Sequence, residues 1–139
     1  MKVFIGEYPK NETEKQQIDI QIDSWDTWNM DTTLAHIVVP MLKQLKVNKH
    51  GVPLVDLEDV PEELRVDSKV SLNDVDENYV KRWDYVLDEM IFAFESKLTF
   101  WEDQFYLNDE CDYEGMRSFE ERIKKGFLLF GKYFQALWD

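Results

Sequence analysis

An apolar stripe with helical spacing runs through residues 79–97 and constrains the fold more than any other feature of the chain. The stripe consists of Tyr79, Trp83, Val86, Leu87, Met90, Ile91 and Phe94. These side chains recur every three or four residues, which places them on one face of an α-helix. The pattern predicts a helix over 79–97, and Asp76 or Asn78 is positioned to cap its first free amides.

A second helical pattern covers residues 32–50. Its apolar stripe is made of Leu34, Ile37, Val38, Met41, Leu42 and Leu45. Asp31 precedes the stripe and suits an N-cap. Pro40 lies inside the pattern and lacks a backbone donor, so we expect a kink or a short break there. Lys49 and His50, followed by Gly51, are typical of a helix end.

A third helix is predicted over 113–138. Its stripe is Met116, Phe119, Ile123, Phe127, Phe130, Phe134 and Leu137. Gly126 and Gly131 interrupt it and weaken an isolated helix by about 1 kcal/mol each relative to Ala. We expect these glycines to admit a bulky side chain from a neighbouring element.

The N-terminal residues 1–23 show the pattern of a β-hairpin. Ile18, Ile20 and Ile22 alternate strictly with polar residues, as in a half-buried strand. A short β-rich segment over 2–9 precedes a polar stretch that serves as the hairpin loop. Because an isolated hairpin is marginal in water, its isoleucine face must pack on helices. The expected fold is therefore α+β and mostly helical, with three main helices packed on an N-terminal β-hairpin in a single domain, 1–139.

Residues 52–78 form an acidic connection between the first two helices. This segment is rich in Asp and Glu and holds Pro53 and Pro61. We expect it to run over the surface, with one turn at Pro61-Glu62-Glu63-Leu64.

Composition narrows the classes of function. The chain has 16 Lys+Arg and 29 Asp+Glu, a formal net charge of −13, yet 14% of its residues are aromatic, which argues against disorder. Such an acidic surface repels phosphate backbones, so bulk nucleic-acid binding is excluded. The longest uncharged apolar run, 37–42, is far shorter than the roughly 20 residues of a membrane span. The lone Cys111 fits a reducing cytosol, and no export signal opens the chain.

One predicted ligand site combines positive charge with indole rings. Lys43, Lys46 and Lys49 follow one another at spacings of three, and His50 ends the same helix. Together with Trp25 and Trp28 they suit a small anionic aromatic ligand such as a nucleotide, which needs both charge and stacking. The alternative is a solvated helix face whose cations compensate the helix dipole.

Carboxylates offer weaker candidates. Asp23, Asp26 and Asp31 are oxygen ligands of the kind that Mg²⁺ prefers, although a helix cap at Asp31 and solvated Asp23 and Asp26 explain them better, because they need no further partner. Asp84 and Asp88 share a helix face and suit acid–base chemistry or simple solvation.

The small number of histidines and the lack of catalytic motifs argue against a zinc site and against catalysis. Two histidines and one cysteine are too few for zinc, so we expect His36 to be buried and hydrogen-bonded. The sequence has no glycine-rich phosphate loop and no Gly-x-Ser-x-Gly. We therefore expect no catalytic residues, no metal and no cofactor.

Several segments resemble a family of small, functionally unassigned proteins of tailed bacteriophages. The similar segments are 2–6, 22–35, 40–46, 50–53, 58–64, 81–91 and 126–139, so the resemblance spans most of the chain. Members of this family often carry a long insertion after the first strand and another before the last helix. Here those places hold only residues 9–17 and about 107–112, and the chain looks like a shortened member.

The resemblance implies a phage protein of the host cytoplasm that acts in host takeover or counter-defence. We expect stoichiometric binding without turnover, either of a small anionic ligand or of a basic host protein that the acidic surface attracts. The alternative is a metal-dependent enzyme that uses the clustered Asp residues. Aromatic side chains of the third helix leave a homo-oligomer open.

Overall fold

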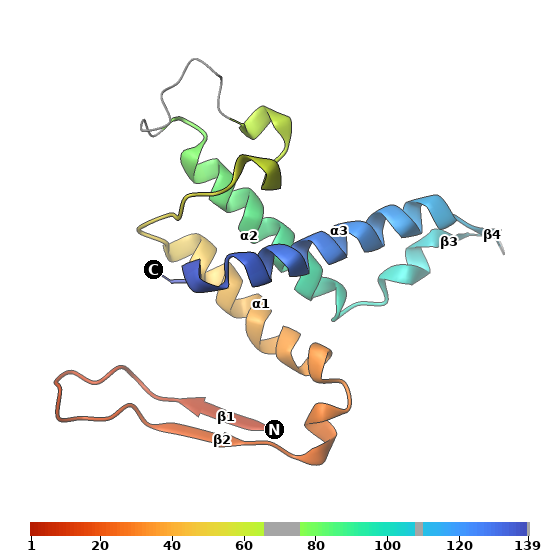
Figure 1. The fold of residues 1–139 in the computed structure, drawn as a ribbon. Helices are drawn as coiled ribbons and strands as arrows, with labels where there is room; N and C mark the ends of the chain where they lie inside the picture. Colours follow the sequence, from red (N-terminus) through yellow and green to blue (C-terminus); the bar gives the residue numbers. More distant parts are fainter. Residues whose placement is uncertain (66–75, 108–109, 139) are drawn as a thin grey trace. The chain divides into compact units, whose positions relative to one another are not determined.

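The computed structural model describes residues 1–65, 76–107 and 110–138 (Figure 1). Its contacts divide the chain into two compact units, Met1–Leu34 and Ala35–Asp139, and each is considered by itself. The described residues form three α-helices and an N-terminal two-stranded antiparallel hairpin, which confirms the predicted α+β, mostly helical class.

The predicted elements are found close to their expected bounds. The strands are β1 (Lys2–Ile5) and β2 (Ile18–Gln21), and the helices are α1 (Met30–Asn48), α2 (Tyr79–Ser96) and α3 (Tyr113–Lys132). Short 3-10 turns cover Ser24–Thr27, Leu57–Asp59, Glu62–Leu64, Trp101–Phe105 and Phe134–Ala136. A second small hairpin, β3 (Tyr106–Leu107) with β4 (Glu110–Cys111), has no counterpart among the predictions. None of the helices in the described residues has the length and apolarity to cross a membrane.

The register of the first hairpin confirms the predicted alternation. Val3 pairs with Ile20 and Ile5 pairs with Ile18, so these four side chains lie on one face. Between them, Phe4 pairs with Asp19 on the opposite face. The strands therefore separate an apolar face from a mixed one.

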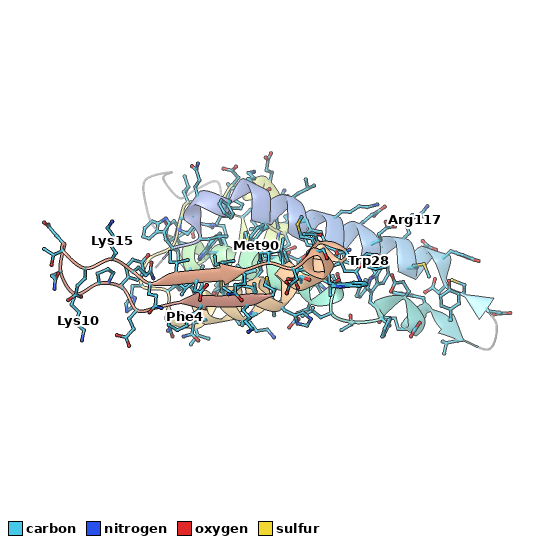
Figure 2. The ribbon with its side chains drawn as sticks, turned by 90° about the horizontal axis from the view of Figure 1, so that it is seen from below. Phe4, Lys10, Lys15, Trp28, Met90 and Arg117 are labelled. Carbon is cyan, nitrogen blue, oxygen red and sulfur yellow. The ribbon has the colours of Figure 1, made fainter. Side chains whose placement is uncertain are left out.

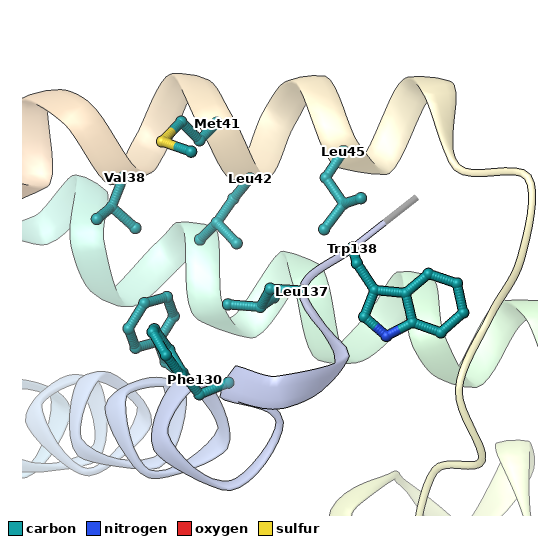
Figure 3. A pocket seen from close by; sticks show the side chains of 8 residues that line it. Val38, Met41, Leu42, Leu45, Phe130, Leu137 and Trp138 are labelled. Atoms are coloured by element: carbon teal, nitrogen blue, oxygen red, sulfur yellow. The ribbon is translucent and has the colours of Figure 1, made fainter. Parts of the chain in front are cut away.

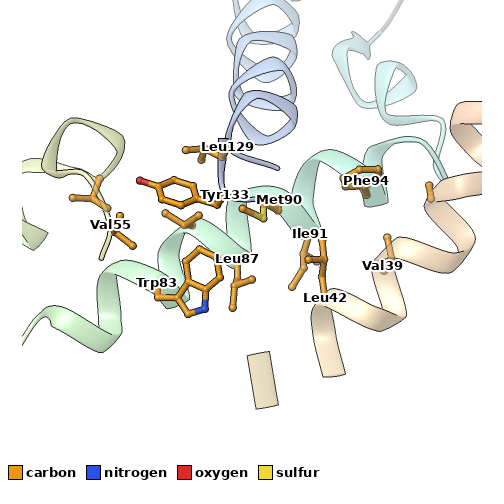
Figure 4. Close-up of a cluster of buried hydrophobic side chains, with 13 residues drawn as sticks. Val39, Leu42, Val55, Trp83, Leu87, Met90, Ile91, Phe94, Leu129 and Tyr133 are labelled. Atoms are coloured by element: carbon orange, nitrogen blue, oxygen red, sulfur yellow. The ribbon is translucent and has the colours of Figure 1, made fainter. Parts of the chain in front are cut away.

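Helix α2 lies at the centre of the core of the second unit (Figure 4). Its largest fully buried side chains are Trp83, Val86, Leu87 and Met90. The ring of Tyr133 packs edge-on against Trp83, with 5.7 Å between the ring centroids. The stripe predicted for residues 79–97 thus forms the centre of the hydrophobic core of this unit.

Helix α1 buries a face that only partly matches the prediction. Leu42 of the predicted stripe is buried and Val38 and Leu45 pack against the core, whereas Met41 is exposed. Ala35 and Val39 are buried as well, so the buried face is rotated by about one residue from part of the predicted stripe. The same rotation leaves His36 exposed, so the prediction that it is buried is wrong. The helix also continues through Pro40 without a break.

The connection after α1 contributes to the core instead of running over the surface as predicted. Val55 and Val60 are only 4% and 2% exposed. The hydroxyl of Tyr133 accepts a hydrogen bond from the Asp56 amide at 2.9 Å and donates one to Asp59 at 2.5 Å. Burial, helped by Asp59, raises the pKa of Tyr133 to about 12. The predicted turn at 61–64 is present, and the part of the connection over 66–75 lies outside the described residues.

Two buried charges on α2 are held by ion pairs. The Arg82 guanidinium lies 2.9 Å from Asp76, and this contact holds the pKa of the Asp76 carboxyl below its usual value. Glu89 receives a bidentate pair from Arg122 of α3, with the shortest bond at 2.7 Å. Both pairs satisfy charges that would otherwise be costly in the core.

Gly126 marks the place where α3 crosses α2. A Cβ atom at this position would overlap the carbonyl oxygen of Glu89 and lie 2.5 Å from the Cβ of Ala93. The glycine therefore admits a neighbouring backbone and an alanine, not the bulky side chain that we expected. Gly131 has nothing within 4 Å of the corresponding position.

The two glycines of α3 form a matched pair for mutation. Gly126→Ala should lower the free energy of unfolding by about 2–3 kcal/mol, because the added methyl forces the two helices apart. Gly131→Ala should raise it by up to about 1 kcal/mol, because alanine favours the helix and meets no neighbour. Urea unfolding of the two variants checks this, and equal effects would contradict the close crossing.

Candidate functional site

The residues of the predicted ligand site belong to two different units. Trp25 and Trp28 lie in the first unit, whereas the three lysines and His50 lie in the second. The indoles are stacked on each other, with centroids 5.2 Å apart and an angle of 17° between the planes. They are 72% and 74% exposed, so their outer faces are open for contact.

The three lysines of α1 are paired with three carboxylates of α2. Lys43 lies 2.5 Å from Glu95, and Lys46 lies 2.5 Å from Asp88. Lys49, whose side chain is only 13% exposed, lies 2.7 Å from Asp84. We call these three ion pairs the charge ladder. It joins two sets of residues that the sequence analysis had treated as separate candidate sites.

The charge ladder changes what the lysines can do. A shallow hollow of about 640 Å³ above it is lined by the three lysines together with Asp84 and Asp88. An anion entering this hollow meets both signs of charge, and it competes with a carboxylate for each ammonium group. The pairs also explain why such a dense positive cluster is tolerated in α1.

The carboxylates after β2 are engaged locally. Asp26 accepts a hydrogen bond from the Asp23 amide at 2.7 Å, and the amino group of Met1 lies 2.8 Å from the same carboxylate. The hydrogen bond from this amine, with that from the Asp23 amide, holds the pKa of Asp26 below its usual value. Across residues 1–65, 76–107 and 110–138, no three His, Cys, Asp or Glu side chains are gathered in a way that could hold a metal ion.

An apolar groove in the second unit was missed by the sequence analysis. It has a volume of about 540 Å³, within the usual range for ligand pockets. Figure 3 shows Val38, Met41, Leu42 and Leu45 along α1 on one side, and Phe130, Leu137 and Trp138 on the other. Part of this α1 stripe was expected to be core. The same residues also line the groove, because Leu42 belongs to the core while Val38, Met41 and Leu45 lie at its margin.

A second apolar surface lies on the hairpin of the first unit. Val3, Ile5, Ile18 and Ile20 share one face, and their exposed fractions are 43%, 60%, 59% and 52%. We call these four residues the hairpin face. Figure 2 shows Lys10 and Lys15 at the loop end of the hairpin, far from Trp28 at its other end. The hairpin face itself carries no charged side chain.

A comparison of the chain with protein-family models, with curated proteins and with solved structures finds no match.

The charge ladder predicts how the protein responds to anions. The triple variant Asp84→Asn, Asp88→Asn, Glu95→Gln frees the lysines, so millimolar pyrophosphate at low ionic strength should raise its Tm. A concentration ten times Kd stabilises the folded state by about 1.4 kcal/mol, which corresponds to a few °C. The wild-type protein should show no such rise.

The matched control carries the same change of charge away from the ladder, at the exposed acids Glu102, Asp103 and Glu110. If the control responds as the triple variant does, net charge and not lysine release explains the effect. A rise of equal size in the wild-type protein would show that the paired lysines are already available.

Proposed function

We propose that this protein is a phage-encoded, non-enzymatic binding protein that holds a host protein stoichiometrically in the host cytoplasm, as part of host takeover or counter-defence. The observation that carries the binding role is the hairpin face, an uncovered apolar surface on a two-stranded sheet. Exposed contiguous apolar surfaces of this kind mark interaction sites. The phage setting rests on the resemblance of residues 22–35 and 81–91 to tailed-phage proteins.

A protein partner is better supported than a small anion. The small-anion version needs Lys43, Lys46 and Lys49, and each of these already has a carboxylate within 2.7 Å. The stacked indoles of Trp25 and Trp28 are equally suited to a protein partner, because exposed Trp is a frequent anchor of protein interfaces. A protein partner and a small anion would both fit the same proposed role, stoichiometric binding without turnover.

The net charge of −13 favours a basic partner. Opposite charge on two proteins speeds their encounter and suppresses partners of the wrong sign. This contribution weakens as salt rises, because surface charges are screened over about 10 Å at 0.1 M ionic strength. Apolar contacts of the hairpin face depend less on salt. In the proposed complex, association is therefore sensitive to salt, whereas the apolar contacts hold the bound partner at higher salt as well.

The proposal is tested by capture from a bacterial lysate on the immobilised full chain. A host protein retained by the wild type should be lost, at least about tenfold, with the double variant Ile5→Ser, Ile18→Ser, because about 1.4 kcal/mol of binding energy is a factor of ten. Capture should also decline as the salt concentration rises.

The control is Phe100→Ser, Leu107→Ser, which removes two apolar side chains outside the first hairpin that are even more exposed than Ile5 and Ile18. This variant should capture the same protein as the wild type does. NMR signals of the Phe4 and Asp19 amides report whether the hairpin is still formed in the Ser variant. The proposal fails if no protein distinguishes the wild type from the hairpin variant.

A further inference from the structure

The first hairpin is a sheet of only two strands, so each strand is also an edge. The ladder of an antiparallel pair alternates between residues that exchange hydrogen bonds and residues whose backbone groups point away from the partner strand. The Gly6 amide donates to the Gln17 carbonyl at 2.8 Å, and this bond sets the phase of the alternation.

The phase determines which backbone groups point outward. Counting back from Gly6 and Gln17, the hydrogen-bonded pair next to them is Phe4 with Asp19. The pairs that alternate with these are Ile5 with Ile18 and Val3 with Ile20, the four residues of the hairpin face. Their N–H and C=O groups point outward, away from the partner strand. On the β2 edge these residues are Ile18 and Ile20. The edge that can receive a further strand is therefore lined by the same residues that form the apolar face.

The charges distinguish the two edges. Strand β1 carries Lys2, whereas the amino group of Met1 is paired with Asp26, in the segment after β2. Lysine on an edge strand disfavours pairing with a further strand, above all a basic one. The chain has no Lys or Arg at all from residue 16 to residue 42, and this stretch holds Asp19, Asp23, Asp26 and Asp31. The β2 edge is thus open, apolar on one face and acidic in its surroundings.

The other face of the hairpin adds a site for a cation. Asp19 lies opposite Phe4, and both side chains are exposed. A lysine or arginine on an added strand, at the position next to Asp19, reaches a carboxylate and the neighbourhood of an aromatic ring. The residues before and after this lysine or arginine in the added strand lie on the opposite face, and when they are apolar they extend the apolar surface of Ile18 and Ile20. The matching sequence alternates basic and apolar residues.

A second copy of the chain is a poorer occupant of this edge. Pairing of two β2 strands places two copies of the same acidic segment, with Asp19 and Asp23, beside each other. Like charges on neighbouring strands are destabilising. The charge pattern therefore selects a different molecule.

We propose that the β2 edge binds an extended segment of the partner protein, in which basic and apolar residues alternate, as an added β-strand. This inference rests on the proposed binding function and names the partner chemistry and the mode of recognition. Main-chain hydrogen bonds supply affinity in such strand addition, and alternate side chains supply specificity.

The test uses the full chain and a set of synthetic nine-residue peptides in which Lys or Arg alternates with Val or Ile. Binding should protect the amides of Ile18 and Ile20 from hydrogen exchange in NMR spectra. Two matched peptides are the controls: one with Glu in place of the basic residues, and one N-methylated on the alternate amides that face β2. Both should bind at least about tenfold more weakly, since each removes one of the two contributions.

Two variants of one residue separate the backbone contribution from that of the side chain. Ile20→Pro removes an outward amide of β2 together with the isoleucine side chain, whereas Ile20→Ala removes most of the side chain and keeps the amide. The Ile20 amide does not belong to the β1–β2 ladder, so both variants should retain the hairpin. Peptide affinity should be at least about tenfold lower in Ile20→Pro than in Ile20→Ala.

The remaining outcomes overturn strand addition. If the peptides bind but N-methylation and Ile20→Pro have no effect, the edge is not used. The hairpin face, tested separately by Ile5→Ser, can then still be the binding surface of the proposed function. If no basic peptide binds, or the acidic ones bind equally, the partner chemistry is wrong. A dimer in sedimentation that Ile20→Pro abolishes would assign the edge to a second copy.

Discussion

The close crossing of α3 over α2 is the contact on which the second unit depends. It brings the Gly126 backbone against the carbonyl oxygen of Glu89 and the Cβ of Ala93. This approach places Arg122 within reach of the buried Glu89 carboxylate and sets the rings of Phe127 and Phe130 edge-on against Phe94. The face of α2 that carries Asp84, Asp88 and Glu95 is occupied by the lysines of α1. The side chains of α2 are therefore engaged mainly in contacts with α1 and α3 that stabilise the second unit.

How far the sequence predicts this fold depends on whether a pattern is local. The α2 stripe and the hairpin alternation were predictable because each has one clear period. The extent of helix α1 was predicted, but its rotation about the helix axis was not fully predicted. Apolar residues such as Leu34 and Ala35 lie on adjacent faces, so two faces could be buried, and only tertiary packing selects between them. The burial of Val55 and Val60 follows from tertiary contacts with no periodic signal.

The candidate sites were less predictable than the elements. Lys46 and Asp88 are 42 positions apart, and their pairing depends on how α1 and α2 lie along each other. Each was visible in the sequence as a member of a charged face, but not as a partner of the other. The stacking of Trp25 on Trp28 is a local contact that their spacing of three residues allows.

Charge and apolar surface are arranged differently in the two units. In the second unit, the basic residues of α1 are neutralised by neighbouring acids, and Lys132 contacts both Asp56 and Asp59. In the first unit, Lys2 lies in β1 and the other lysines lie in the hairpin loop, which also holds three glutamates, while four aspartates lie in or after β2. The first unit thus combines an exposed apolar face with an excess of acidic over basic residues, and an excess of negative charge favours encounter with a basic partner.

The central claim is that the β2 edge is open in the free protein. Hydrogen exchange of the backbone amides, followed by NMR on the full chain without a partner, measures this directly. The amides of Ile18 and Ile20 should exchange much faster than those of Phe4 and Asp19, which belong to the hydrogen-bonded pairs of the hairpin. Protection of the Ile18 and Ile20 amides equal to that of Phe4 and Asp19 would show that the edge is already occupied, and would contradict the claim.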